Sequence, residues 1–515
     1  MTTRHLLLAG LLLSAGAASA QTGDIYAGEA FRFSEIQQTG TARFRGIGGN
    51  QAALGGDASN LFGNPAGLAF YNRSELSLSP SVNILSNDAT YLGNNSLSNG
   101  TKFSVGQLGL IFAGGDNNGS RWRRTTFGVG YNQNANYFNE FSFQGRNNRS
   151  SFVDPILQDA NRRNVLGSQI DAQYNPNTNQ ATDLLAAAYQ LFLVNGVPVG
   201  TNDSGAPFTR FDATRPRDQR NTFSSTGSQS QWTFAYAGNL DDKLYLGANL
   251  GLATVRYNTD NVLTETIVNG QVFDTNAQRD RLTVKGNGFN LKIGAIYKLT
   301  PDIQIGATVA TPTFMSIRET FNQSLSVVAR DPKLPLNNNS VDVQPSDFNY
   351  SITTPFRASG GTTVFLGKGK IGFLTASAEY VGYGGLRAST TDNGNAQSNT
   401  DFKNGVRNSV QSTYQSVVNV RGGAEVRAGL FRVRAGVAYL PDPYVKKLDN
   451  IDRSRLLLSG GVGIRNERFF ADVSGTYNTF KSAFTPYTLP NTADYGSAQI
   501  TNNSTNVTLS VGTFF

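Results

Sequence analysis

The strongest constraint on the fold is a strict alternation of apolar and polar residues. Between residues 418 and 428, valine, alanine and glycine occupy every second position, while Arg421, Glu425 and Arg427 fall on the intervening positions. Side chains alternate between the two faces of a β-strand. The pattern therefore predicts strands with one face in lipid or an apolar core and the other in a wet lumen.

Similar segments recur along the chain, for example at 244–252, 291–297, 303–309 and 469–477. Tight turns such as Asn466-Glu467 contrast with long polar connections. A secreted β-sandwich or propeller would also alternate, but short turns on one side and long loops on the other are typical of membrane barrels. We predict an all-β, transmembrane antiparallel β-barrel, with about fourteen to sixteen candidate strands along the chain.

The amino terminus has the features of a secretory signal. Arg4 precedes an apolar run at residues 6–13, and Ala18-Ser19-Ala20 is an A-x-A cleavage site. We expect residues 1–20 to be removed, which makes Gln21 the first mature residue. The apolar run is shorter than the roughly 20 residues that a spanning helix needs.

The last ten residues, NVTLSVGTFF, alternate in the same way and end on Phe515. They resemble the closing strand of bacterial outer-membrane barrels, although Thr513 stands where that pattern is usually apolar. The resemblance implies an outer-membrane location and recognition of this strand by the barrel-assembly machinery. An edge strand of a soluble β-protein is the alternative interpretation.

Composition agrees with a barrel. The chain has 55 Gly, 33 Phe and 20 Tyr among 515 residues, and only 16% of its residues are charged. Such a composition favours strands and turns. The mean hydropathy is −0.30, which is compatible with a barrel because every second residue faces the lumen. We attribute the net charge of +8 to loops and lumen, and expect no nucleic-acid partner.

Two missing residue types exclude several chemistries. The chain has no cysteine, and its only histidine is His5, inside the predicted signal. This excludes a Ser-His-Asp triad, a Cys-His dyad and zinc sites built on His or Cys. A hydrolase that uses only carboxylates stays possible in principle. We expect no enzymatic activity, no cofactor and no metal site.

Three stretches lack the strand pattern: residues 21–70, about 144–228 and about 322–349. The last two are predicted to be long outer loops. A predicted helix at Asp183–Val194 carries an apolar face formed by Leu184, Ala188, Leu191 and Phe192. This face either packs inside a solvated loop or binds a hydrophobic ligand.

The segment 46–70 is rich in Gly and Ala and carries few charges. Small side chains allow close packing and sharp turns, and Pro65 disfavours a helical conformation at Asn64. We therefore predict that residues 21–70 form a plug inside the lumen and that residues 71–515 form the barrel.

Within this segment, Gly56-Asp57-Ala58-Ser59 and Asn64-Pro65-Ala66-Gly67-Leu68-Ala69 resemble the amino-terminal hatch of the FadL/TodX family, outer-membrane transporters of long-chain fatty acids and other hydrophobic compounds. Further matching segments lie at 354–357, 378–381, 419–425, 433–436 and 470–473, and they resemble the Bacteroidetes-like branch. The family resemblance implies a 14-stranded barrel, ligand capture by outer loops, a hatch and lateral exit through the wall. Carried over to this chain, the hatch motif comprises Gly63, Asn64, Pro65, Ala66 and Gly67.

Three predicted lumen arginines could contact a ligand carboxylate. Alternation places Arg421, Arg427 and Arg434 on the inward face. The alternative is that they neutralise acids such as Glu425, which also faces inward.

The sequence thus predicts an outer-membrane channel for passive uptake of fatty acids or other hydrophobic compounds. Its expected partners are a hydrophobic small molecule, outer-membrane lipid and lipopolysaccharide, and we expect a monomer. A diffusion porin for polar solutes and a structural or adhesive surface protein are the alternatives.

Overall fold

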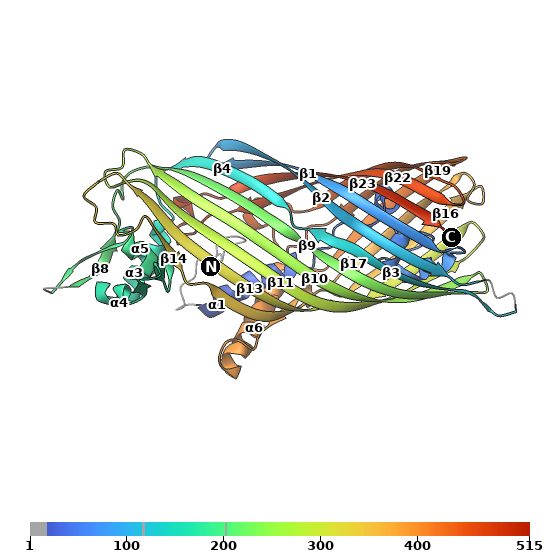
Figure 1. Cartoon of the computed structure of the whole chain (residues 1–515), viewed down its shortest axis with the longest axis horizontal. Helices are drawn as coiled ribbons and strands as arrows, with labels where there is room; N and C mark the ends of the chain where they lie inside the picture. The colour runs from blue at the N-terminus through green and yellow to red at the C-terminus, as the bar shows by residue number, and fades with distance from the viewer. Residues whose placement is uncertain (1–17, 116–118, 201–202) are drawn as a thin grey trace.

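The computed structural model describes residues 18–115, 119–200 and 203–515, so most of the predicted signal peptide lies outside it. The described chain forms a closed barrel of 14 antiparallel strands, as predicted. The barrel closes because the last strand pairs with the first, from Glu75↔Phe514 to Thr90↔Gln499 (Figure 1). The pairing of β23 with β1 removes the free edges that the first and last strands of an open sheet would expose.

Four of the 14 wall positions are each filled by two consecutive strands separated by a short break. The wall strands are β1 (Glu75–Tyr91), β2 (Asn94–Ala113), β3 (Trp122–Asn136) with β4 (Asn139–Asn147), β9 (Arg217–Leu240), β10 (Leu244–Ile267), β11 (Phe273–Lys298), β12 (Ile303–Ala310) with β13 (Phe314–Ala329), β15 (Ser346–Thr353) with β16 (Arg357–Leu366), β17 (Gly372–Val381) with β18 (Arg387–Ser389), β19 (Val417–Ala428), β20 (Phe431–Leu440), β21 (Arg455–Arg465), β22 (Phe469–Phe484) and β23 (Ala498–Phe514).

The outer surface is an apolar belt, and the inner surface is polar. On β19, Val418 and Val426 are 49% and 56% exposed, whereas the alternating Glu425 is 2% exposed. On β23, Leu509 is 43% exposed and Ser510 is buried. The alternation therefore placed lipid-facing and lumen-facing side chains correctly.

The two ends of the barrel differ (Figure 1). One end has short turns and holds the carboxyl terminus, whereas the other carries long connections. The two connections predicted at about 144–228 and 322–349 are shorter in the structure, because β4 and β9 reach residues 147 and 217, and β13 and β15 reach residues 329 and 346. These strand ends do not continue the lipid-facing apolar pattern, because their apolar residues, such as Phe143 and Leu325, are buried instead.

An outer cap, residues 148–216, stands at the end with long connections. It contains α3 (Val153–Arg163), α4 (Gly167–Asp171), β5 (Tyr174–Asn175), β6 (Gln180–Ala181), α5 (Leu184–Gln190), β7 (Asn195–Val199) and β8 (Asp203–Thr209), and β14 (Ser340–Val343) pairs with β6. Its apolar core packs onto the ends of β10, β11 and β13. Three short 3-10 helices lie in other connections: η3 (Tyr383–Gly385), η4 (Leu448–Asn450) and η5 (Thr492–Asp494).

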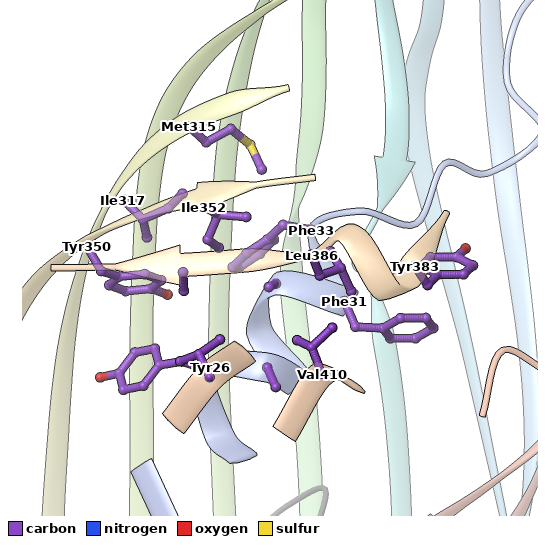
Figure 2. Packing of buried hydrophobic residues seen from close by; sticks show 14 of the residues in the cluster. Tyr26, Phe31, Phe33, Met315, Ile317, Tyr350, Ile352, Tyr383, Leu386 and Val410 are labelled. Atoms are coloured by element: carbon purple, nitrogen blue, oxygen red, sulfur yellow. The ribbon is translucent and has the colours of Figure 1, made fainter. Parts of the chain in front are cut away.

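The amino-terminal segment lies inside the barrel, as predicted. It comprises α1 (Ala18–Arg32), α2 (Ala42–Gly46), η1 (Ala58–Leu61) and η2 (Pro65–Phe70). The α1 helix packs against inward residues of the wall and against α6 (Ala396–Thr413) in one aromatic-rich cluster, in which Tyr26, Phe31 and Phe33 face Tyr350, Ile352 and Tyr383 (Figure 2).

No helix in the described part of the chain is long and apolar enough to cross a membrane.

Candidate functional site

The hatch motif is held by Asn64, which uses both ends of its amide. Its Oδ1 accepts from the Ala66 amide at 3.1 Å and so caps η2, where Pro65 occupies the first turn. Its Nδ2 donates to Ala52 O at 2.6 Å and to Ala295 O and Ala307 O at 3.3 Å each. One buried side chain therefore starts a helix and attaches the plug to β11 and β12.

Close packing inside the plug requires glycine at Gly67, whereas Gly63 faces the flexible end of Gln51. A Cβ on Gly67 would lie 2.2 Å from Asn60 Nδ2, and one on Gly63 would lie 1.5 Å from Gln51 Oε1. Asn60 cannot easily move, because its Nδ2 donates to Leu54 O and Asn64 O. Ala66 is fully buried. These positions fit a close-packed hatch, while any role in gating stays a prediction.

The plug backbone lies directly on glycines of the inner wall. A Cβ on Gly306 would lie 2.0 Å from Ala52 O, and one on Gly294 would lie 2.0 Å from Asn64 Oδ1. Further wall glycines meet the plug in the same way: Gly247, Gly423 and Gly436. Side chains at these inward positions would displace the plug.

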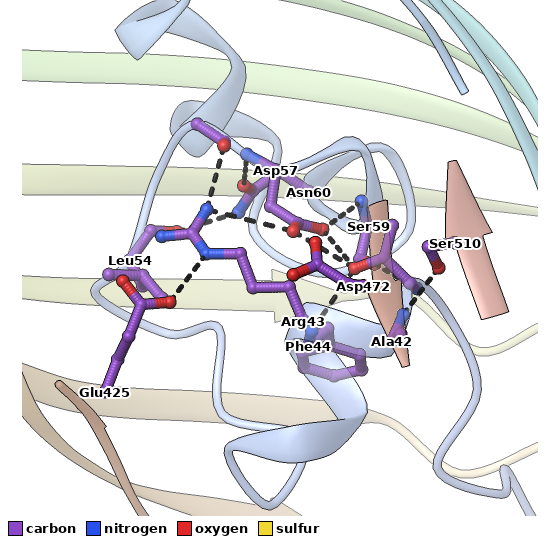
Figure 3. Close-up of polar contacts among 12 residues, drawn as sticks. Ala42, Arg43, Phe44, Leu54, Asp57, Ser59, Asn60, Glu425, Asp472 and Ser510 are labelled. Carbon is purple, nitrogen blue, oxygen red and sulfur yellow. Dashed lines mark hydrogen bonds and ion pairs between the residues drawn. The ribbon is translucent and has the colours of Figure 1, made fainter. Parts of the chain in front are cut away.

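A buried ion-pair network connects the plug to strands β19, β20 and β22, and Figure 3 shows the part around Arg43. Arg43 Nε lies 3.4 Å from Glu425 Oε2, and its Nη1 lies 3.8 Å from Asp57 Oδ2. Arg434 then joins Glu425, at 2.7 Å, to Asp472, at 2.6 Å. Burial alone would lower the pKa of Arg43, but the carboxylates of Glu425 and Asp57 outweigh it and raise that pKa.

The three predicted lumen arginines separate in the structure. Arg434 is fully committed to the network, and Arg427 Nε pairs with Glu425 Oε1 at 2.8 Å, which favours the pairing alternative for both. Arg421 pairs with Glu379 at 2.7 Å and lines a cavity above the plug. The predicted contact with a ligand carboxylate stays a prediction for all three.

This lumen cavity has a volume of about 470 Å³ and lies between residues 32–64 of the amino-terminal segment and the inner wall. Its lining is dominated by amide side chains and includes the cations of Arg45, Lys292 and Arg357. Burial lowers the pKa of Arg45, in the plug, to about 10, so this group stays charged at neutral pH.

A second space, the aromatic cavity, adjoins the lumen cavity and shares lining residues such as Tyr257, Tyr383 and Phe480 with it. Its volume is about 390 Å³. Its apolar lining includes Phe31, Phe141, Phe223, Phe321, Tyr444 and Phe484.

The predicted helix at Asp183–Val194 forms over Leu184–Gln190 with Asp183 as its cap. It ends early because Phe192 adopts a left-handed backbone with φ of 55°. Ala188 and Leu191 are fully buried in the outer cap, and Leu184 and Phe192 pack against the same core. None of these four is among the described residues that line the two cavities. Their predicted ligand contact is untested.

The barrel wall has a weak seam beside the lumen cavity. The backbone ladder between β2 and β3 ends at Gln107↔Asn132, and in the described chain no ladder joins β2 to β4. Side chains cross the gap, as in the contact of Ser98 Oγ with Ser142 Oγ at 3.3 Å. We call this region the β2–β4 seam.

Gln37, which follows α1, bonds the end of β3 beside the seam. Its backbone amide donates to Asn134 O at 2.9 Å, and its side chain bonds the backbone of Asn136 in both directions, at 2.9 and 3.0 Å. Residues 132–134 and 136–139 of the broken strand line the lumen cavity. The plug, the cavity and the seam therefore meet at one place.

Sequence reasoning missed Arg43, Asp472, Lys292 and the seam. Ion pairs between residues hundreds of positions apart leave no local pattern. The inner-wall glycines did carry a signal, because glycine recurs at the inward positions of neighbouring strands.

No protein-family model and no curated protein sequence matches the chain. Several solved structures match the chain in fold. The toluene transporter TodX of P. putida is 12% identical with a TM-score of 0.54, and the match covers 94% of this chain and 99% of that one. A FadL homologue from Pseudomonas aeruginosa is 12% identical with a TM-score of 0.51 over the same shares.

At this identity the likeness establishes the fold, which is the barrel of the FadL and TodX structures. Together with the closed barrel and its apolar outer belt, this fold places the chain in the bacterial outer membrane, as the sequence predicted.

Proposed function

We propose that the protein is a channel for passive uptake of long-chain fatty acids or other hydrophobic compounds across the outer membrane. Ligand is captured at the outer end, enters the aromatic cavity, passes to the lumen cavity and leaves laterally through the β2–β4 seam. The observation that carries the proposal is the meeting of plug, cavity and seam at Gln37. The toluene transporter among the structural neighbours supports a hydrophobic cargo.

The physical basis is hydrophobic transfer without passage through water. Burying an apolar chain is worth about 0.8 kcal/mol per CH₂, so a fatty chain that reaches the seam moves into the bilayer rather than into the periplasm. Movement of Gln37 with the plug would release the end of β3 beside the seam. In this proposal the hatch gates the exit of the ligand through the seam. Transport needs no energy source if the cargo is consumed after it leaves the channel.

The polar lining of the lumen cavity favours a second candidate, a diffusion porin for polar solutes. A porin needs an open lumen, whereas the plug here contacts strands around the barrel. In a porin the seam would carry no flux.

A disulfide across the seam tests the proposal. The chain has no cysteine, so the double variant Ser98→Cys/Ser142→Cys introduces only the intended pair. We expect uptake of radiolabelled oleate by cells to fall strongly when the pair is oxidised and to recover with reductant. The matched control is Ser81→Cys/Thr508→Cys, which joins two residues that are directly paired in the β1–β23 ladder. Unchanged uptake by the oxidised seam variant would contradict lateral release.

A further inference from the structure

The lumen cavity contains a buried cation that no carboxylate of the described residues neutralises. Arg45 is 4% exposed and lines the cavity. Its guanidinium donates to Asn506 Oδ1, and its Nε has no hydrogen-bond partner. In the part of the chain that the structure describes it forms no ion pair, unlike Arg421 with Glu379 and Arg455 with Glu35.

The charges of the cavity lining are unbalanced as well. Six basic residues line it, Arg32, Arg45, Lys292, Arg357, Arg421 and Arg455, against the two acids Glu35 and Glu379, and of the six Arg32 pairs with Glu29 outside the lining. Both oxygens of Glu379 already accept bonds from Arg357, Arg421 and Asn419. Lys292 donates to the plug carbonyl of Phe62 and forms no ion pair among the described residues.

The same cavity presents buried hydrogen-bond acceptors without donors. Asn87, Asn132 and Asn290 each donate through Nδ2 to protein atoms, while their Oδ1 atoms have no partner within the described part of the chain. An apolar ligand would leave these acceptors and Arg45 unsatisfied, and each unsatisfied buried group costs about 1–3 kcal/mol. These unsatisfied polar groups make the lumen cavity unfavourable for a plain hydrocarbon.

We propose that the lumen cavity binds the head group of an anionic amphiphile that carries a carboxylate and at least one further hydrogen-bond donor, such as a long-chain N-acyl amino acid. The carboxylate pairs with Arg45, and the head-group N–H or O–H donates to the free amide oxygens. The acyl chain lies in the adjoining aromatic cavity. This inference rests on the proposed function and names the class of cargo.

Because Arg45 belongs to the plug, the head group would contact the plug and the wall together. Asn506, the partner of Arg45, lies on β23 and pairs directly with Asn83 of β1. Asn132 lies on β3 at the end of the β2–β3 ladder. The head group is thereby placed beside the seam through which the tail would leave.

The test is binding of radiolabelled N-dodecanoylglycine to the full mature protein in lipid nanodiscs. Three comparison ligands separate the contributions: dodecanoate lacks the amide, the methyl ester of N-dodecanoylglycine lacks the charge, and dodecylbenzene lacks both. Hydrogen bonds to charged groups contribute about 1.5–3 kcal/mol, so we expect the ester to bind about 10- to 100-fold more weakly than the acid. Dodecanoate should fall between the two.

Arg45→Met should lower the affinity for N-dodecanoylglycine to that of the ester, and Arg45→Lys should restore most of it. The Arg45→Met variant should fold, because Arg45 forms no ion pair among the described residues and its removal leaves none of their carboxylates unpaired. Heat-dependent gel mobility of the barrel checks that the variant is folded. Lys285→Met is the matched control: Lys285 is exposed on the same strand as Lys292 but at an outward position. It should bind like the unmodified chain.

Equal affinity for acid and ester, or an Arg45→Met variant that binds normally, would mean that the cavity is only hydrated and would overturn the inference. Equal affinity for dodecanoate and N-dodecanoylglycine would overturn the requirement for a donor. If dodecylbenzene binds as tightly as the acid, the inference fails and the proposed function stands. If none of the four ligands binds, the proposed function fails with it.

Discussion

At the scale of single residues, the plug is fixed by polar groups that serve two purposes. Asn64 caps η2 with its oxygen and bonds two wall strands with its nitrogen. Arg43 joins the plug acid Asp57 to the wall acid Glu425. Such groups are expensive to bury alone, so their partners determine where the plug can rest.

Exchanging the Asn64 donor for an acceptor should release the plug. Asn64→Ala loses the cap, at about 0.5–2 kcal/mol, and also the wall bonds. Asn64→Asp keeps the capping oxygen but sets a carboxylate against the carbonyls of Ala52, Ala295 and Ala307. We therefore expect the aspartate variant to leak more than the alanine variant, measured as sensitivity of cells to a large antibiotic. Wild-type behaviour of Asn64→Asp would show that the cap alone matters.

Arg434 should be structural rather than ligand-binding. Arg434→Met leaves Asp472 buried without its cation, which costs about 3–5 kcal/mol when one partner of a buried pair is removed. The unfolding temperature of the barrel, followed by gel mobility, should fall. The double variant Arg434→Met/Asp472→Asn should recover much of the loss. A single variant as stable as the unmodified chain would argue against the network.

At the scale of elements, the sequence specified the strands well and their contacts poorly. Alternation at 418–428 fixes which face is inward, because a shift of one residue would turn every charge toward lipid. It could not show that Arg434 would meet Asp472, since that pairing depends on the register of β20 against β21 and β22. Nor could it show the seam, since the polar segment 132–139 gives no preferred face.

The glycine contacts between wall and plug can be tested one strand at a time. Gly306→Val adds a side chain whose Cβ would lie 2.0 Å from Ala52 O. We expect the barrel to form and the plug to be displaced, with increased antibiotic sensitivity. Gly360→Ala on the neighbouring β16 is the control, because its nearest neighbour would lie 3.9 Å away. If the two variants show equal antibiotic sensitivity, contact with the wall glycines does not determine how the plug docks.

At the scale of the whole molecule, the wall and the plug are separable in principle. The first wall strand begins at Glu75 and closes on β23 through a backbone ladder that Ser74 extends to Phe515, and this ladder uses no backbone of residues 21–69. The plug in turn occupies the lumen through contacts on β10, β11, β19, β20 and β22, among others. Conduction should therefore depend on the plug, whereas closure of the barrel should not.

Deleting residues 21–69 tests this division and separates a gated channel from a porin. With the plug removed, the wall glycines and the polar lumen face open water, and we expect a large, steady conductance in planar bilayers where the intact protein shows little. The deletion also removes Arg43 and leaves Glu425 with Arg427 and Arg434, so the ion pairs of the wall survive. A porin would conduct equally with and without residues 21–69. Low conductance of both the intact protein and the deletion variant would instead mean that the outer cap closes the lumen. The gate would then be assigned to residues 148–216 rather than to the plug.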